Sequence, residues 1–397
     1  MALFDPRAHE PLVDVEWSAA KMRDAVAAIA ADADNALRPV AWWPAHPLDD
    51  EGDLPEASHT LYLGAAGVLW GLDQLAGAGL HEPGHDYPAL AHRALDGYDR
   101  APEFDGPQPS LWLGECGVAL VAWLLSPDAA VADRLAALAE RDPAGDTIEL
   151  TWGSPGILLA AGAMLERTGE AHWRMRWQAI ADRLLAHWGA EVPGFWTQHL
   201  TWSWRTGELL GPAHGFAGIV AALACRPELV PPAELLRLTK PALAATAVHA
   251  GGQANWPSAR DSALRGENGE IRTQWCHGAP GMVASLASLA PDDELDALLL
   301  AGGELTWAAG PLRKGAGLCH GTAGNGFAFL ALFARTGDEV WLERARRFAM
   351  HAASQVAAGR RADGRGRYTL WTGDVGAALY LMQCLAADGR FPTIDWW

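Results

Sequence analysis

The chain has 397 residues, of which 50% are hydrophobic and 20% are charged, and its formal net charge is −18. This composition is typical of a globular protein with a large core, and the negative charge disfavours nucleic acid as a partner because it repels phosphate backbones. No apolar run approaches the roughly 20 residues of a membrane span, and the N-terminal sequence lacks the basic and apolar regions of a secretory signal. We therefore expect a cytoplasmic protein without a membrane span.

In chain order, amphipathic segments alternate with segments that are apolar on most faces. The amphipathic segments have apolar residues at helical spacing with charges between them, which predicts helices exposed on one face; the clearest are 21–33, 132–142, 173–188 and 340–357. The apolar segments, such as those following Gly67 and Asn325, predict buried helices. Strand signal is weak. Two segments rich in Gly, Trp and Pro, 189–213 and 250–274, are predicted to be long loops over one rim, and such loops often serve as functional lids.

The phrase Gly-x-x-Gly, followed by an apolar run, occurs seven times. The copies lie at 64–67, 114–117, 153–156, 215–218, 278–281, 321–324 and 373–376. A pair of helices of this size cannot bury its own apolar face, so neighbouring repeats must stack. The pattern predicts an all-α, closed (α/α)7 double barrel of seven outer and seven inner helices. This single domain would cover residues 1–397, with the first outer helix inside 1–59.

The glycines would let each inner helix begin in a tight turn that packs closely on its neighbours. If all the inner helices run in one direction, the seven turns meet at one mouth of the barrel. We also expect the free N–H groups of the inner helices to point there, where they would favour anions and thiolates.

Copies four to six of the repeat carry additional chemistry. GPAHGFAG contains His214, WCHGAPG contains Cys276 and His277, and LCHGTAG contains Cys319 and His320. Because the repeats superpose, these side chains should lie around the same mouth. Two thiolates and one imidazole suit Zn²⁺ and leave its fourth position open, which is typical of a catalytic site. The sequence therefore predicts Cys276, Cys319 and His320 as zinc ligands, the alternative being buried cysteines and hydrogen-bonded core histidines.

An odd total of five cysteines, without a secretory signal, argues against a disulfide framework. Charged residues also stand close to the turns. Glu149 precedes copy three, Arg272 precedes Cys276, and Arg313 and Lys314 precede Cys319. Each is a candidate site residue, although each could equally be a solvated side chain.

The phrases GPAHGFAGI, WCHGAPG and KGAGLCHGTAGNGFAFL resemble the three signature segments of the lanthionine synthetase C-like (LanC-like) family. The resemblance extends from about residue 60 to the C-terminus and is less clear over 1–59. It implies an (α/α)7 toroid with one zinc ion at the mouth, held by Cys276, Cys319 and His320. It also implies that His214 is an acid/base residue and that Arg272 is the family's arginine ahead of the first zinc cysteine.

The resemblance is closer to the eukaryotic-type branch of the family than to the lantibiotic cyclases. The cyclases have aspartate where this chain has Glu149, and the eukaryotic-type proteins have glutamate. His277, the NWP phrase at 255–257 and the KGAGLCHG run also fit that branch. There, a lysine matching Lys314 and an arginine upstream of the last repeat bind glutathione; in this chain the arginine would be Arg365 or Arg367.

The resemblance predicts a zinc-dependent enzyme that adds a thiol, from glutathione or a peptide cysteine, to dehydroalanine or dehydrobutyrine residues of a peptide or protein. A thioether forms. In this hypothesis Arg272 stabilises the enolate oxygen, His214 transfers the proton and Glu149 orients His214. At this length there is no room for a fused dehydratase, which favours a free-standing enzyme.

Two alternatives remain. One is a non-catalytic sensor or scaffold that binds zinc and glutathione, since binding and catalysis use the same ligands. The other is a helical toroid that processes glycosides or transfers prenyl groups. The former reaction needs paired carboxylates, of which the mouth has few. The latter needs a basic diphosphate pocket, for which Arg313 and Lys314 alone are thin support.

Overall fold

The computed structural model describes residues 2–38, 40–49, 58–104, 106–141, 147–200, 205–261 and 269–397. In these ranges the chain forms fourteen α-helices, a short 3₁₀ helix at Pro6–Ala8 and two two-stranded sheets. The odd-numbered helices are α1 (Ala19–Ala36), α3 (Tyr87–Arg100), α5 (Ala129–Glu140), α7 (Ala171–Ala186), α9 (Pro232–Thr246), α11 (Asp293–Ala309) and α13 (Glu339–Asp363). The even-numbered helices are α2 (Ala65–Gly77), α4 (Glu115–Leu125), α6 (Ser154–Thr168), α8 (Phe216–Ala224), α10 (Ala279–Leu286), α12 (Thr322–Thr336) and α14 (Asp374–Ala386).

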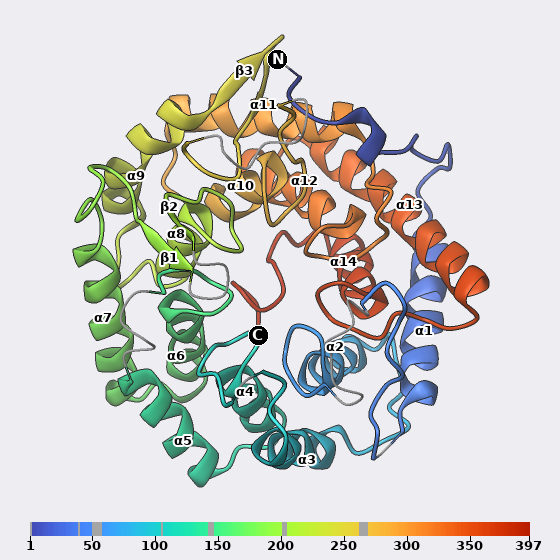
Figure 1. The fold of residues 1–397 in the computed structure, drawn as a ribbon. Coiled ribbons are helices and arrows are strands. Elements are labelled where there is room, and N and C mark those ends of the chain that lie inside the picture. Colours follow the sequence, from blue (N-terminus) through green and yellow to red (C-terminus); the bar gives the residue numbers. More distant parts are fainter. Residues whose placement is uncertain are drawn as a thin grey trace.

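The helices form two concentric rings (Figure 1). The odd-numbered helices make the outer ring and the even-numbered helices the inner one. Each inner helix contacts the next, and α14 contacts α2, so the inner ring is closed. The predicted helical double barrel is therefore confirmed.

The two rings differ in burial and in the way their helices begin. In α12, every residue from Thr322 to Leu332 is buried. In α13, the buried residues lie mainly at helical spacing, with one continuous buried run at 348–352; they are Trp341, Leu342, Ala345, Phe348, Ala349, Met350, His351, Ala352 and Val356. Five of the outer helices start at a Ser or Asp whose side chain accepts a backbone N–H, as Ser18 does for α1. All seven inner helices start at the first glycine of the repeat.

The second glycine of each repeat is required by a close approach of the backbone. A Cβ atom at this position would clash with the carbonyl oxygen of the residue six positions earlier, in all seven repeats. The oxygens belong to Leu61, Leu111, Leu150, Pro212, Trp275, Leu318 and Leu370. The turn before each inner helix thus folds back over the first helical turn, and only glycine leaves room for it.

The turns also provide hydrogen-bond acceptors for the first N–H groups of the inner helices. In six of the seven inner helices, the first N–H group donates to the carbonyl seven residues earlier, as Thr322 does to Gly315 at 2.9 Å. In α10 the Asn255 side chain takes that role, accepting from the Ala279 N–H at 2.7 Å. The prediction that free N–H groups point into the mouth is therefore wrong for the first N–H group of each inner helix, because the turn, or in α10 the Asn255 side chain, accepts it.

One small hairpin lies within the first predicted long loop, and another spans the start of the second. Strand β1 (Gln198–Leu200) pairs with β2 (Arg205–Gly207), and β3 (Val248–Ala250) pairs with β4 (Gln253–Asn255). The loops also bind each other, since the Leu210 N–H donates to the Ser258 carbonyl at 3.0 Å. Gly251 and Gly252, both with positive φ, form the β3–β4 turn, so the Gly-Gly pair was a hairpin signal that the loop prediction missed.

Aromatic side chains fill the centre of the barrel. Trp112, Trp275 and Trp371 come from the turns before α4, α10 and α14, and their ring centroids lie 4.2 to 6.0 Å apart. Phe391, from the C-terminal segment that ends near the centre of the ring (Figure 1), stacks on Trp275 at 4.9 Å. No helix in the described part of the chain is long and apolar enough to cross a membrane.

Candidate metal centre and catalytic residues

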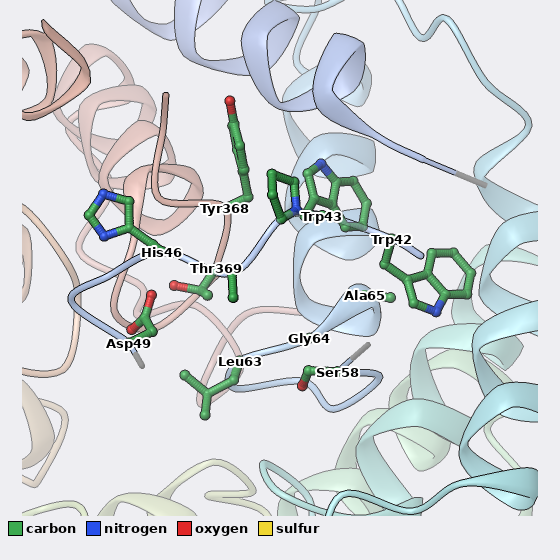
Figure 2. Close-up of a pocket in the computed structure, with 12 residues that line it drawn as sticks. Trp42, Trp43, His46, Asp49, Ser58, Leu63, Gly64, Ala65, Tyr368 and Thr369 are labelled. Carbon is green, nitrogen blue, oxygen red and sulfur yellow. The ribbon is translucent and has the colours of Figure 1, made fainter. Parts of the chain in front are cut away.

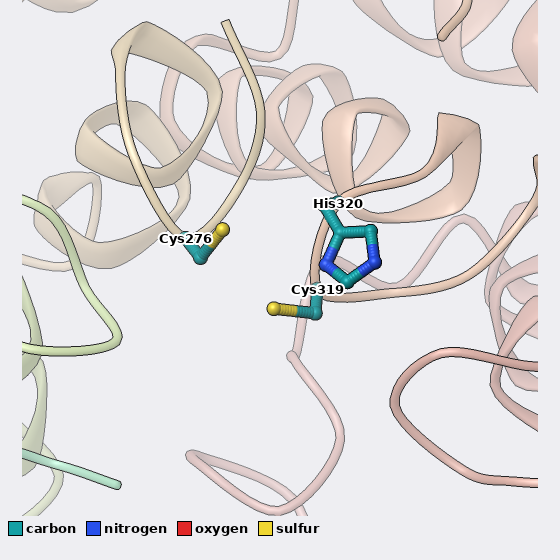
Figure 3. A group of neighbouring side chains, drawn as sticks. All are labelled: Cys276, Cys319 and His320. Atoms are coloured by element: carbon teal, nitrogen blue, oxygen red, sulfur yellow. The ribbon is translucent and has the colours of Figure 1, made fainter. Parts of the chain in front are cut away.

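Cys276, Cys319 and His320 lie together at the mouth, on the turns before α10 and α12 (Figure 3). Their ligand atoms all lie within 4.8 Å of one another, and both cysteines are buried. The Cys276 N–H donates to the Cys319 carbonyl at 3.0 Å, which joins the two turns. The structure therefore brings the three predicted ligands together.

This donor set fits zinc. A tetrahedral ion about 2.3 Å from sulfur and about 2.0 Å from nitrogen separates its ligand atoms by roughly 3.5 to 3.8 Å, so only small side-chain movements are needed. The pKa of Cys276 is held well below its usual value because the Cys319 thiol hydrogen-bonds to it and because His277 and His320 are near. The same hydrogen bond raises the pKa of Cys319. The pair is thus prepared to carry thiolate charge.

His214 and Glu149 form a hydrogen-bonded pair beside the cysteines. The His214 Nδ1 atom lies 2.7 Å from Oε2 of Glu149, whose side chain is fully buried. The carboxylate also accepts the N–H groups of Thr151, at 3.0 Å, and of Trp152. Although burial lowers the pKa of His214, the Glu149 carboxylate and the nearby Cys276 outweigh it, so that the pKa is raised. The pair therefore favours a protonated imidazole.

Arg272 and His277 border the same turn. Arg272 is exposed, in the segment that leads into the turn carrying Cys276. Burial lowers the pKa of His277, and the charges of His214 and Arg272 act in the same direction. These effects favour the neutral form of His277, whose ring centroid lies 6.1 Å from that of His214.

Lys314 and Arg365 line one pocket, between α13 and the turns before α12 and α14. Arg367 lines it too, but its Nε atom lies 2.8 Å from Asp49, which pairs with it. Among the described residues, Lys314 and Arg365 have no carboxylate partner within ion-pair distance. The geometry therefore favours Arg365 over Arg367 as the candidate anion contact. Lys314 is also close enough to Cys319 to lower the pKa of that thiol, against the larger effects that raise it.

A second pocket adjoins the first (Figure 2). Trp42, Trp43 and Tyr368 give it aromatic walls, and His46 lines both pockets. The segment 40–49 is thus a wall between an aromatic pocket and a cationic one. Asp49 fixes this wall, because it binds Arg367 and also accepts the Thr372 hydroxyl at 2.8 Å.

Comparison with known proteins identifies the family. A family model described as lanthionine synthetase C-like protein matches residues 55–395. The chain belongs to this family. It is 33% identical over 201 residues to glutathione S-transferase LANCL1 of Danio rerio, which is 49% of this chain and 48% of that protein. It is 32% identical over 130 residues to LanC-like protein GCL1 of Arabidopsis thaliana, which is 31% of this chain and 30% of that protein.

The matches thus span about half and about a third of the lengths of these two relatives. A solved structure of nisin cyclase superposes with a TM-score of 0.57 and 17% identity, covering 84% of this chain and 89% of that one. At this identity the likeness shows the LanC-like fold alone. The predicted family resemblance is confirmed.

Two residues of this LanC-like site were not predicted. The Gln274 side chain donates from Nε2 to the Cys276 sulfur at 3.0 Å. The Tyr62 hydroxyl lies beside Cys319. Burial is the main cause that raises the pKa of Tyr62, and the charge of Cys319 and a hydrogen bond with it act in the same direction. A signal for Gln274 exists in the repeat register, since it stands four residues before its glycine, as Glu149 does. Tyr62 belongs to repeat one, and only closure of the ring brings it to repeat six.

Proposed function

We propose that this LanC-like protein is a zinc-dependent enzyme that adds a thiol to dehydroalanine or dehydrobutyrine residues of a peptide or protein, forming a thioether. One observation carries the proposal: the Cys276, Cys319 and His320 cluster shares its mouth with the His214–Glu149 pair. A metal centre alone would suit a sensor or scaffold. A carboxylate-supported imidazole beside it is the arrangement that proton transfer requires.

Cys276, Cys319 and His320 would hold the ion and leave one position for the substrate thiol. When bound, zinc would lower the pKa of that thiol and keep it as a reactive thiolate. In the addition, the substrate thiol would lose its proton to solvent and its sulfur would bond to the β-carbon of the dehydro residue. The electron pair of the broken C=C π bond would move onto the α-carbon and its amide oxygen.

The remaining chemistry falls to side chains of the chain itself. Arg272, which is exposed in the segment that leads into the Cys276 turn, would donate to the amide oxygen as negative charge develops there. His214 gives a proton to the α-carbon through Nε2, the nitrogen that Glu149 does not bind. Such a positioned general acid contributes about 100- to 10,000-fold. Glu149 acts through His214, by holding the ring and stabilising its protonated form.

We propose glutathione as the thiol. It carries two carboxylates, and the pocket beside Cys319 presents Lys314 and Arg365 without carboxylate partners among the described residues. The printed name of the Danio rerio relative, a glutathione S-transferase, agrees with this choice. A glutathione-using enzyme would work in the reducing cytoplasm. A cysteine within the acceptor peptide is the competing thiol, and it needs no anion pocket.

The test is an addition assay with zinc-loaded protein, a dehydroalanine peptide, and either glutathione or a cysteine-containing peptide. Product is measured by mass spectrometry. We expect glutathione adducts with the unaltered protein and at least a hundredfold loss in both Cys319→Ala and His214→Ala, in line with the value of a general acid. Cys384→Ala, which removes a buried thiol of α14, is the control. Full activity in Cys319→Ala would refute the zinc mechanism, and zinc and glutathione binding without turnover would favour the sensor.

A further inference from the structure

One register position of the repeat supplies two polar side chains to the site. The residue four positions before the first glycine is, in chain order, Thr60, Ser110, Glu149, Gly211, Gln274, Gly317 and Thr369. Only the third and fifth are long and polar. Glu149 reaches across to His214 at 2.7 Å, whereas Gln274 turns onto its own repeat and donates to the Cys276 sulfur at 3.0 Å.

The local backbone fixes this contact. Gln274 and His277 exchange two backbone hydrogen bonds, each 3.1 Å long, so that Trp275 and Cys276 form the tip of a tight turn. The Gln274 side chain closes a second ring across the same turn, which restricts the rotation of the Cys276 side chain. Trp275 is fully buried and anchors the tip from below.

Repeat six does not have this contact. Gly317 occupies the equivalent position, and a Cβ atom there would lie 2.6 Å from the Thr372 carbonyl oxygen. A side chain is therefore excluded. The two cysteines thus differ in their surroundings: a carboxamide from the same turn donates to Cys276, whereas the equivalent position beside Cys319 has no side chain.

We infer that Gln274 is a positioning residue of the metal centre, whose carboxamide holds the Cys276 sulfur toward Cys319 and His320 and makes that sulfur a poorer nucleophile. An N–H donor withdraws electron density from a thiolate ligand, and such outer hydrogen bonds tune both affinity and reactivity. The inference rests on the proposed function, because a site that presents an electrophile to a thiolate endangers its own cysteines. Gln274 directs the reaction to the substrate sulfur.

The experiment uses the full chain with Gln274→Leu, which removes the donor, and Gln274→Asn, which keeps the amide but shortens its reach by one methylene. The matched control is Gln178→Leu, on the exposed face of α7, where the glutamine bonds only Asp182 in the described structure. Zinc affinity is measured by competition with a chromophoric chelator. Modification of each cysteine is followed by peptide mapping after incubation of the zinc-loaded protein with a dehydroalanine peptide.

We expect both Gln274 variants to bind zinc about 10- to 100-fold more weakly and to accumulate adducts on Cys276 several-fold faster, with Gln178→Leu unchanged. Circular dichroism verifies that the variants are folded. Unchanged zinc affinity together with unchanged Cys276 modification would overturn the inference and leave the proposed function intact. Failure of the unaltered protein to bind zinc would overturn both.

Discussion

The Glu149→Gln substitution tests the link between the buried carboxylate and the general acid. Glu149 accepts three hydrogen bonds: Oε2 from Thr151 and His214, and Oε1 from Trp152. Glutamine has one oxygen and one NH₂ group. If its oxygen keeps the hydrogen bonds from Thr151 and His214, its NH₂ group must lie against the Trp152 N–H. One buried donor then faces another, which costs about 1–3 kcal/mol of folding free energy.

The larger effect falls on His214. Removing an opposite charge within hydrogen-bond distance lowers a pKa by about 1–3 units, and the burial of His214, which already lowers its pKa, then acts unopposed. In the unaltered protein the raised pKa of His214 contributes stability that is fully present below the unfolded pKa and is lost as pH rises through the folded value. The variant loses this contribution, so its stability depends less on pH in that window.

The assay is the pH dependence of thiol addition, combined with an NMR titration of the labelled histidines. We expect the alkaline limb of the profile, where protonated His214 is lost, to move down by about 1–3 pH units. At pH values above the His214 pKa of the unaltered protein the rate should fall by about the same number of powers of ten, and at lower pH by less. Glu149→Asp, which keeps the charge on a shorter side chain, should give an intermediate result. An unmoved alkaline limb with an unmoved His214 titration would refute the reasoning.

Three further predictions concern stability, measured by urea unfolding. Asp49→Ala breaks the mostly buried ion pair with Arg367 and should lower the free energy of unfolding by about 3–5 kcal/mol. Asp388→Ala breaks the more exposed pair with Arg390 and should lower it by less than about 1 kcal/mol; equal losses would contradict the difference in burial. Gly324→Ala should destabilise the protein by several kcal/mol because its Cβ atom would clash with the Leu318 carbonyl oxygen. Gly359→Ala, in α13 with open space around it, should stabilise the protein by about 0.5–1 kcal/mol; the reverse order would refute the close approach of Leu318 to Gly324. Burial raises the pKa of Asp374 to about 6, so stability should fall as pH rises from the unfolded pKa through that value. Asp374→Asn should flatten this slope, and an unchanged slope would exclude Asp374 as its source.

The repeat made the fold predictable. A glycine is needed wherever the turn crosses the first helical turn, as at Gly324 under the Leu318 carbonyl, and seven such positions therefore repeat in the sequence. The alternation of buried and amphipathic helices then indicates two rings. Short hairpins were missed because each strand has only three residues, too few for an alternating pattern to be recognised.

The residues of the candidate site that occupy equivalent positions in the repeats could be predicted from the sequence. Cys276, Cys319 and His320 occupy equivalent turns, so superposition of the repeats places them together. Contacts that depend on packing between distant segments were not predictable. The choice between Arg365 and Arg367 depends on Asp49, far away in the sequence, which engages the second arginine.

The aromatic core has a consequence for the size of substrate. Trp112, Trp275 and Trp371 are completely buried and pack on one another, so aromatic side chains fill the ring beside the metal turns. Under the proposed function, an acceptor would have to present only one dehydro residue at the mouth that holds Cys276, Cys319 and His320. Under the same proposal, the barrel would then set no limit on the length of the acceptor, so that a folded protein with a dehydro residue on a protruding loop would be accepted like a short peptide.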